Sequence, residues 1–242
     1  MSTLPAPRFA GSPRPPPALV GLAALTALLV GVSLWLIFVV APVEARMGIV
    51  QKIFYFHVPS AYAMYLGFGL CGIGSSVYLL RRRGRWDALA VAGAEVGLLF
   101  ALIVLTTGPM WARKAWGVWW TWDPRLTTTL LAAMIFTAYA VLRSSGAAGE
   151  AEKRFASALA IVGMFMLPVI HFSVQQWRGT HPQVISRGGG GLHPDMVPAL
   201  IVGFVTFTCL TALLVWTRMR AERTAEELSA LEREAAEQGL LD

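Results

Sequence analysis

The sequence carries little charge for its length. Only 14% of its 242 residues are charged, whereas about a quarter are charged in an ordinary soluble protein. Hydrophobic residues make up 56% of the chain, and its mean hydropathy is +0.59. Because so few charges cannot coat a water-facing surface, the composition excludes a soluble globular protein. We predict an all-α integral membrane protein.

The sequence also lacks the motifs of several enzyme and redox classes. Its two cysteines, Cys71 and Cys209, lie in apolar segments and form no CxxC pair, which excludes a thiol-oxidoreductase motif and a CxxCH haem attachment site. No GxxxxGK[ST] loop is present, so the chain is not itself an ATPase. HExxH, zinc-finger and GxSxG patterns are missing as well. The GxGxxG match at Gly67–Gly72 lies inside an apolar run rather than after a strand, and it indicates close helix packing.

Long apolar runs, by contrast, are abundant and predict six membrane spans. A helix needs about 20 apolar residues to cross a hydrocarbon core of about 30 Å. The runs that meet this requirement are residues 19–41, 60–80, 88–107, 126–142, 155–174 and 196–217. The first run is longer than the apolar region of a signal peptide, which has about 7–15 residues, so we predict that it is retained.

The distribution of Lys and Arg orients these spans. With the N-terminus in the cytoplasm, 13 of the 20 basic residues fall in inner segments and 7 in outer ones, with the run Arg81–Arg85 as the strongest marker. The positive-inside rule then predicts that both termini face the cytoplasm. The outer loops are residues 42–59, 108–125 and 175–195. The net charge of +6 therefore orients helices and does not indicate binding to nucleic acid.

Two tails flank the predicted membrane domain of residues 19–217. Residues 1–18 are basic and rich in proline, which predicts a disordered cytoplasmic segment. Residues 218–242 mix Arg, Glu, Ala and Leu and favour a cytoplasmic helix. That helix is either a solvated tail or a docking element for a cytoplasmic partner.

Tryptophan is concentrated in the second outer loop. Five of the nine tryptophans fall within residues 111–122, whereas an interfacial aromatic belt needs only scattered Trp and Tyr. At helical spacing Trp116, Trp119 and Trp120 share one face. The pattern predicts a flat apolar plate at the outer membrane surface that binds a large planar ligand.

A porphyrin matches such a plate, because its faces are apolar and its two propionates need cations. Basic side chains that suit carboxylates stand beside the tryptophans, namely Arg113, Lys114 and Arg125. Haem iron also needs an axial base, which is normally imidazole.

Two of the four histidines are placed to provide that base. His57 lies three residues before the second predicted span and His181 seven residues after the fifth, so we expect both just above the membrane on the outer side. His171 lies within the fifth span and is expected to pack or form hydrogen bonds. His193 follows the run Gly188–Gly191, a tether that is poorly suited to hold a ligand rigidly.

The run Trp116-Gly-Val-Trp119-Trp120-Thr-Trp122-Asp123-Pro-Arg125-Leu-Thr127 resembles the WWD signature of haem-handling proteins in cytochrome c maturation. The length, six spans and N-in/C-in topology are similar to the haem exporter protein C family over residues 19–217. The sequences around His57-Val-Pro59 and from His171 to His181 support the resemblance independently. Pro124 after the Asp and the glycine-rich residues 188–191 depart from the family pattern.

The resemblance implies that His57 and His181 are the two axial ligands of haem b and that Trp116–Asp123, which includes Trp122, supports the ring. It implies delivery of haem to a periplasmic membrane-anchored haem chaperone. The implied partners are the ATPase and membrane subunits of an ABC transporter and a small single-span protein, in the bacterial inner membrane. ATP use would then belong to the partners. We expect Asp123 to fix the loop by bonding an indole N–H or a neighbouring Arg.

Two other functions remain open from the residues. A membrane cytochrome subunit for electron transfer would usually place its histidine ligands inside the spans at different depths. A small-molecule permease would favour broken helices and polar residues near the midplane. Glu95 is the one carboxylate well inside a span, so we expect it to be paired, protonated or turned to a partner helix.

Overall fold

The computed structural model describes residues 14–144, 149–181 and 192–239. Of the segment predicted to be disordered, residues 1–18, the first 13 lie outside the described residues, whereas Pro17 and Ala18 already belong to a helix. The glycine tether predicted at residues 188–191 also lies outside the described residues. Apart from one isolated bridge between Glu44 and Gly48, the described ranges contain helices, turns and irregular segments. The helices are α1 (Pro17–Trp35), α2 (Phe54–Arg81), α3 (Gly84–Trp116), α4 (Pro124–Ser144), α5 (Glu150–Gln176) and α6 (Val197–Glu237).

Short helical turns extend three of these helices. A π-helical turn η1 (Leu36–Val40) continues α1, a 3-10 turn η2 (Ile49–Ile53) leads into α2, and a second 3-10 turn η3 (Pro194–Met196) leads into α6. Within the described residues, six helices are long and apolar enough to cross a membrane. The prediction of an all-α chain with six spans is therefore confirmed.

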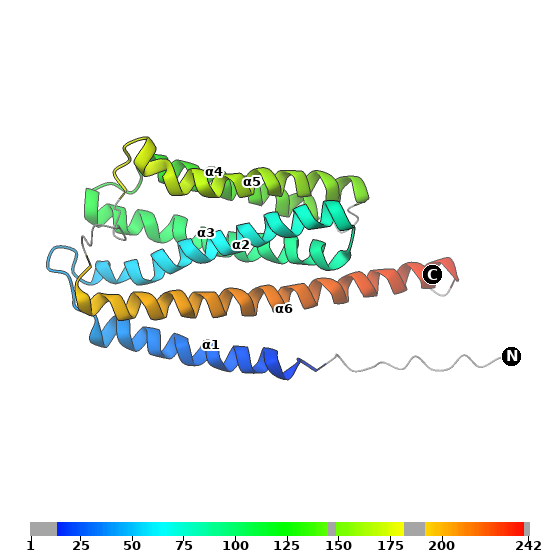
Figure 1. The fold of residues 1–242 in the computed structure, drawn as a ribbon, viewed down its shortest axis with the longest axis horizontal. Helices are drawn as coiled ribbons and strands as arrows, with labels where there is room; N and C mark the ends of the chain where they lie inside the picture. The colour runs from blue at the N-terminus through cyan, green and yellow to red at the C-terminus, as the bar shows by residue number, and fades with distance from the viewer. Residues whose placement is uncertain (1–13, 145–148, 182–191, 240–242) are drawn as a thin grey trace.

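The helices run along the long axis of the molecule and leave their connections at its two ends. One end, which we call the loop end, holds residues 41–48, residues 117–123 and residues 177–181, which follow α5 (Figure 1). The other end, the terminus end, holds the start of α1 and the end of α6 (Figure 1). The described parts of the three predicted outer loops thus share one end, and the two described chain ends share the other.

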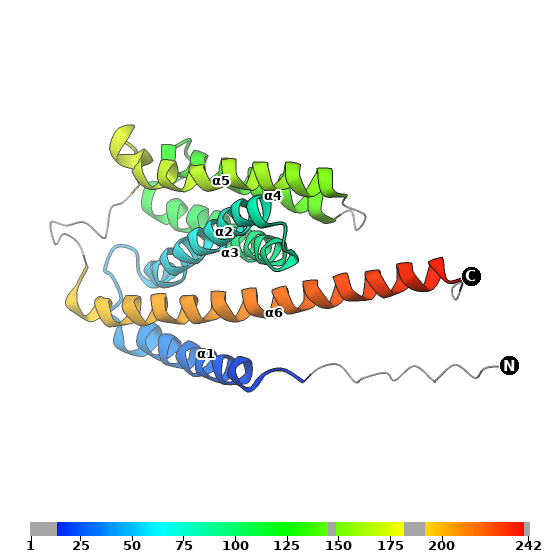
Figure 2. The same cartoon turned by 45° about the vertical axis from the view of Figure 1, so that its right-hand side comes forward.

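Helix α6 stands between α1 and the remaining helices. Helices α2 and α3 pack closely on each other, α5 packs on α4 and α2, and α1 packs mainly on α6, as the turned view in Figure 2 also shows. A hydroxyl contact of 2.8 Å between Ser33 Oγ and Thr206 Oγ1 joins α1 to α6. Helix α6 continues unbroken past Thr217, so the predicted tail from Arg218 extends the last span.

Glycines bring α2 and α3 into backbone contact. A Cβ atom at Gly67 would lie 2.6 Å from the Gly97 backbone, and one at Gly93 would lie 2.6 Å from the Cys71 backbone nitrogen. Such distances leave no room for a side chain, so only glycine allows this approach. The expectation that the GxGxxG match marks close helix packing is confirmed.

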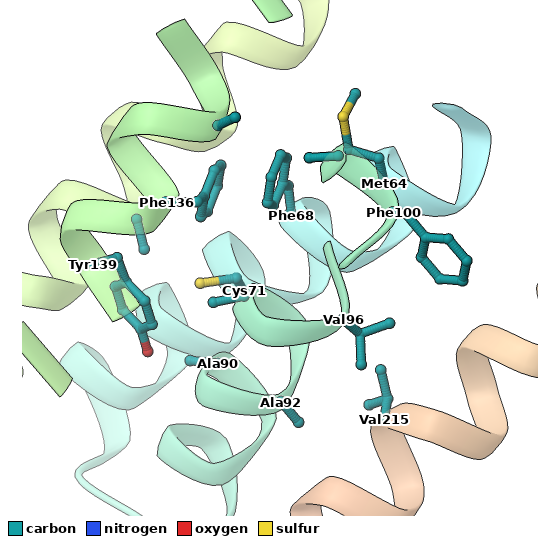
Figure 3. Packing of buried hydrophobic residues seen from close by; sticks show 14 of the residues in the cluster. Met64, Phe68, Cys71, Ala90, Ala92, Val96, Phe100, Phe136, Tyr139 and Val215 are labelled. Atoms are coloured by element: carbon teal, nitrogen blue, oxygen red, sulfur yellow. The ribbon is translucent and has the colours of Figure 1, made fainter. Parts of the chain in front are cut away.

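A hydrophobic core fills the space between α2, α3 and α4. The rings of Phe68 and Phe136 are stacked with centroids 3.8 Å apart and planes at 5°, and Figure 3 shows them face to face. Cys71 is fully buried in the same cluster, as a packing residue should be, while Cys209 is half-buried.

Ion pairs hold the terminus end together. Glu95 receives two hydrogen bonds from Arg218 of α6, at 2.5 Å from Nε and 2.8 Å from Nη2. This pairing is one of the outcomes expected for the carboxylate. Buried Asp87 of α3 binds Arg143 Nη2 at 2.6 Å and Lys153 Nζ at 3.2 Å. These contacts link α3 to α4, α5 and α6.

Candidate functional site

Helix α3 ends inside the tryptophan-rich segment. Gly117 is its C-cap with a φ of +79°, the left-handed conformation that glycine adopts readily at a helix end. The Arg113 guanidinium, one turn earlier, donates a hydrogen bond to the Gly117 carbonyl. Residues 117–123 are therefore not helical. The prediction that Trp116, Trp119 and Trp120 share a helical face is wrong, because the left-handed glycine turns the chain away.

The tryptophans form edge-to-face pairs instead of one flat plate. Trp111 packs against Trp116 with centroids 5.6 Å apart and planes at 89°, and Trp120 packs against Trp122 at 5.8 Å and 81°. Trp119 and Trp122 are 59% and 75% exposed. The segment therefore presents two indoles outward while Trp120 is partly covered.

Asp123 begins helix α4. Its Oδ1 accepts the backbone N–H of Arg125 at 2.9 Å, and its carbonyl accepts the backbone N–H of Thr127 at 2.9 Å. Pro124 occupies the first helical position, where its missing N–H costs nothing. This is the arrangement of an aspartate N-cap. The departure from the family pattern at Pro124 thus falls at a helix position that accepts proline.

The second oxygen of Asp123 holds the segment that carries His181. Oδ2 accepts the Thr180 backbone N–H at 2.6 Å, the Thr180 hydroxyl at 3.2 Å and the His181 backbone N–H at 3.3 Å. Asp123 is only 6% exposed, and a buried carboxylate needs hydrogen-bond donors, which these groups provide. Asp123 fixes the loop as expected, but its partners are backbone N–H groups and a hydroxyl rather than an indole.

Gly179 makes room for that carboxylate. Helix α5 ends with Arg178 in the left-handed region at a φ of +51°, and the Gly179 N–H donates to the Val174 carbonyl at 3.0 Å. A Cβ atom at Gly179 would lie 2.7 Å from Asp123 Oδ2. A side chain at this position would displace the carboxylate that holds the next two residues.

His57 lies inside helix α2. We expected it in a loop before the second span, but Phe54 already starts the helix. The helix begins before the apolar run of residues 60–80 does, because helical hydrogen bonding does not require apolar side chains. The apolar run alone therefore placed the start of the helix too late. Its Nδ1 lies 2.9 Å from the Thr107 hydroxyl of α3. A Cβ atom on Gly108 would come within 3.3 Å of its Cε1 atom, so the ring lies against the α3 backbone.

His57, in the first turn of α2, and His181, which follows α5, both lie at the loop end. Their side chains are close enough to interact electrostatically, although one belongs to α2 and the other follows α5. The other two histidines make different contacts. His171 is exposed on α5 with its ring edge-to-face against Phe172, and His193 caps η3 by accepting the Asp195 N–H.

The predicted cationic side chains are distributed around this site. Arg113 and Lys114 are exposed in the last turn of α3, where Arg113 is bound to the Gly117 carbonyl. Arg125 Nη2 donates to the His171 carbonyl at 3.0 Å. Arg125 therefore joins the start of α4 to α5, and Lys114 extends from the surface.

Three contributors escaped the sequence reasoning. Thr107 and Thr180 each bond a residue of the site, yet no sequence pattern distinguishes them from other threonines. Lys52 was counted as an outer-loop charge, but it is buried and its Nζ donates to the carbonyls of Ile37 and Ala41 at 2.6 and 2.5 Å. It thereby ties η2 to the end of α1.

The groups near His57 do not form a metal cage of protein ligands. Among the side chains that the structure describes, no three of the His, Cys, Asp and Glu types gather as a metal site would require. A cavity of about 720 Å³ lies between α3, α4, α5 and α6, but it is lined by Glu95, Arg143 and Arg218 near the terminus end.

These features define a polytopic membrane protein with two histidines and exposed indoles at one end of its helices. The family model described as heme exporter protein C matches residues 14–234. The chain belongs to the heme exporter protein C family.

Curated relatives agree with this assignment. The chain is 32% identical to a heme exporter protein C from Bradyrhizobium diazoefficiens over 213 residues, which cover 87% of this chain and 81% of the relative. It is 33% identical over 190 residues to a putative cytochrome c biosynthesis ccmC-like mitochondrial protein from Marchantia polymorpha, with 78% and 79% covered. It is 30% identical over 180 residues to the heme exporter protein C of Escherichia coli K12, with 74% and 73% covered.

Proposed function

We propose that this protein holds haem b at its loop end between His57 and His181 and delivers it to a periplasmic membrane-anchored haem chaperone. The observation that carries the proposal is the approach of these two histidines from α2 and from the segment after α5. Two imidazoles on one side of a membrane protein are suited to the two axial positions of a haem iron.

The family gives the coarse function. Family members and relatives are named for haem export and cytochrome c biosynthesis. The protein accordingly takes part in haem handling for cytochrome c maturation, as a multi-pass membrane protein. The identity of the haem, its ligands and its recipient are the finer parts of the proposal.

The tryptophan-rich segment supplies apolar surface for the porphyrin. Trp119 and Trp122 expose most of their rings beside Asp123, which also binds the segment carrying His181. An indole face or edge against the ring shields that side of the haem from water. Lys114, which is exposed in the last turn of α3, is available to a propionate.

The protein acts by positioning. The two imidazoles hold the iron, the indoles limit the orientations of the ring, and a vinyl group is left to project toward the incoming chaperone. Holding two reactants in one orientation raises their effective concentration without proton transfer by the protein. Asp123 serves this task indirectly, because it fixes the segment on which His181 stands.

The implied partners fit a chain that has no ATP-binding loop of its own. We propose assembly with the ATPase and membrane subunits of an ABC transporter and with a small single-span protein in the bacterial inner membrane. The loop end would then face the periplasm, where the chaperone is anchored. The terminus end, with its basic residues, would face the cytoplasm.

Absorption spectra of the purified protein test the ligand pair. The wild-type protein in lipid nanodiscs, supplied with haem, is expected to give a bis-imidazole spectrum. His57→Ala and His181→Ala should each lose this spectrum or release haem readily. His193→Ala is the matched control, because that exposed histidine caps η3. Unchanged spectra in both ligand variants would refute the assignment.

Addition of the chaperone separates delivery from electron transfer. A haem-delivering protein should pass its haem to the added chaperone, whereas a membrane cytochrome should retain it through repeated reduction and oxidation. Retention of haem by this protein in the presence of an active chaperone would favour the cytochrome alternative.

A further inference from the structure

We propose that Thr107 is a positioning residue that sets the tautomer of His57 and so leaves the Nε2 atom of His57 free to bind the haem iron. This inference rests on the proposed role of His57 as an axial ligand. It extends that role to a residue of another helix that has no contact with the iron.

The geometry of one hydroxyl group carries the inference. The Thr107 hydroxyl donates to the Ile103 carbonyl, four residues earlier in α3, at 2.6 Å. The same oxygen lies 2.9 Å from Nδ1 of His57. A threonine hydroxyl has one hydrogen and two lone pairs. With its hydrogen directed to Ile103, the oxygen must accept a hydrogen bond from His57, so Nδ1 carries the proton.

The tautomer decides which nitrogen is available to a metal. A neutral imidazole carries one N–H, and the other nitrogen has an exposed lone pair. When Nδ1–H is bonded to Thr107, the lone pair belongs to Nε2. Metal-bound histidines generally use one ring nitrogen for the metal and donate the other N–H to a neighbouring oxygen, which fixes the ring orientation.

The α3 backbone completes this support. A Cβ atom on Gly108 would come within 3.3 Å of His57 Cε1 and 4.0 Å of His57 Nδ1. The ring edge that contains Nδ1 therefore lies against α3, next to the hydroxyl that it bonds. Ring rotation that brought Nε2 to Thr107 would have to overcome both the packing and the hydrogen bond.

Thr106 provides a matched control in the adjacent position. Its hydroxyl also bonds backwards within α3, to the carbonyls of Leu102 at 2.8 Å and Ile103 at 3.0 Å. It is exposed on the helix surface. Removing this hydroxyl changes the same kind of helix contact without touching His57.

The first measurement needs no haem. Apo protein labelled with ¹⁵N-histidine is studied by NMR in nanodiscs at about pH 8, above the ordinary histidine pKa of about 6.5, and His57 is assigned by comparison with His57→Gln. We expect the Nδ1–H tautomer in the wild type, in Thr107→Ser and in Thr106→Val. Thr107→Val, which keeps the side-chain shape but removes the hydroxyl, should shift His57 toward the Nε2–H tautomer.

The second measurement is haem affinity. Loss of the hydrogen bond between Thr107 and His57 should weaken haem binding about tenfold in Thr107→Val. The haem affinities of Thr107→Ser and Thr106→Val should stay close to that of the wild type. Equal elution and helicity of all variants would exclude misfolding as the cause.

The outcomes distinguish this inference from the function on which it rests. If His57→Ala loses haem but Thr107→Val keeps both the wild-type tautomer and the wild-type affinity, only the role of Thr107 is overturned. The ligand role of His57 then stands. Equal losses in Thr107→Ser and Thr107→Val, or in Thr106→Val, would also overturn it. An unchanged haem spectrum in His57→Ala would overturn the proposed ligand and with it the purpose of the hydrogen bond.

Discussion

Asp123 and Thr180 are joined by two hydrogen bonds although they are 57 positions apart in the chain. One carboxylate oxygen accepts both the backbone N–H of Thr180 at 2.6 Å and its hydroxyl at 3.2 Å. The other oxygen caps helix α4. A single buried side chain thus couples the start of one span to the segment that carries His181.

Replacement of Asp123 should separate these two tasks. Asp123→Ala removes both the helix cap and the bonds to the segment that carries His181. The lost cap alone should destabilise the protein by about 1–2 kcal/mol, and we expect the variant to lose haem binding. Asp123→Asn has a single carbonyl oxygen, so it can satisfy Arg125 or Thr180 but not both. We therefore expect the Asn variant to bind haem weakly. Thermal unfolding and haem titration give the two readouts, and Asp195→Asn at an exposed carboxylate is the control. Normal haem affinity in Asp123→Ala would contradict the coupling.

A methyl group at Gly179 should reproduce the loss of Asp123. Its Cβ atom would lie 2.7 Å from Asp123 Oδ2 and 3.3 Å from the Val174 Cα atom, so the carboxylate has to move. We expect Gly179→Ala to weaken haem binding while the six helices remain folded, as measured by haem titration and circular dichroism. At Gly31 in α1 an added Cβ meets no described atom within 4 Å, so Gly31→Ala should bind haem normally. Wild-type haem affinity in Gly179→Ala would show that the contact is dispensable.

The exposed indoles should contribute to haem binding more than to stability. Trp119 and Trp122 have most of their surface open, so Trp119→Ala and Trp122→Ala should leave the unfolding temperature nearly unchanged. Loss of one aromatic contact should weaken haem binding about five- to tenfold, or about 1–1.4 kcal/mol. Trp35→Ala, at a tryptophan of similar exposure on α1, is the control. Haem dissociation constants equal to that of the wild type in both loop variants would argue against an aromatic support for the ring.

The buried ion cluster at the terminus end should act on stability alone. Asp87 is 2% exposed and is shared by Arg143 and Lys153. Asp87→Asn leaves two cations without their carboxylate, which should cost about 3–5 kcal/mol. We expect a lower unfolding temperature. At temperatures where the variant is folded, its bis-imidazole spectrum should be normal, because the cluster lies at the end opposite to His57 and His181. Glu232→Gln, at an exposed position late in α6, should have no effect. An altered haem spectrum in Asp87→Asn would indicate coupling between the two ends.

Features of single segments of the sequence predicted the six spans and the types of residue in the site. Six apolar runs must become helices because a membrane offers no hydrogen-bond partner to an unpaired backbone. The density of tryptophan and the histidines at positions 57 and 181 indicated a planar ligand. These inferences need only composition, run length and the order of residues along the chain.

The arrangement of the site depends on contacts between distant segments. The end of α3 at Gly117 abolishes the helical tryptophan face, since one left-handed residue redirects everything after it. The bond from Asp123 to Thr180 and the contact of His57 with Thr107 join residues at least 50 positions apart.

The amino-acid order therefore establishes a six-span helical membrane protein with a tryptophan-rich outer loop, because hydrophobic length and residue type are properties of single segments. The packing of α2 against α3 brings His57 Nδ1 to the Thr107 hydroxyl. The packing of the segment after α5 against the start of α4 brings the Thr180 N–H to the Asp123 carboxylate. Hydrogen bonds need their atoms within about 3 Å, and such distances between remote residues exist only after the helices have packed.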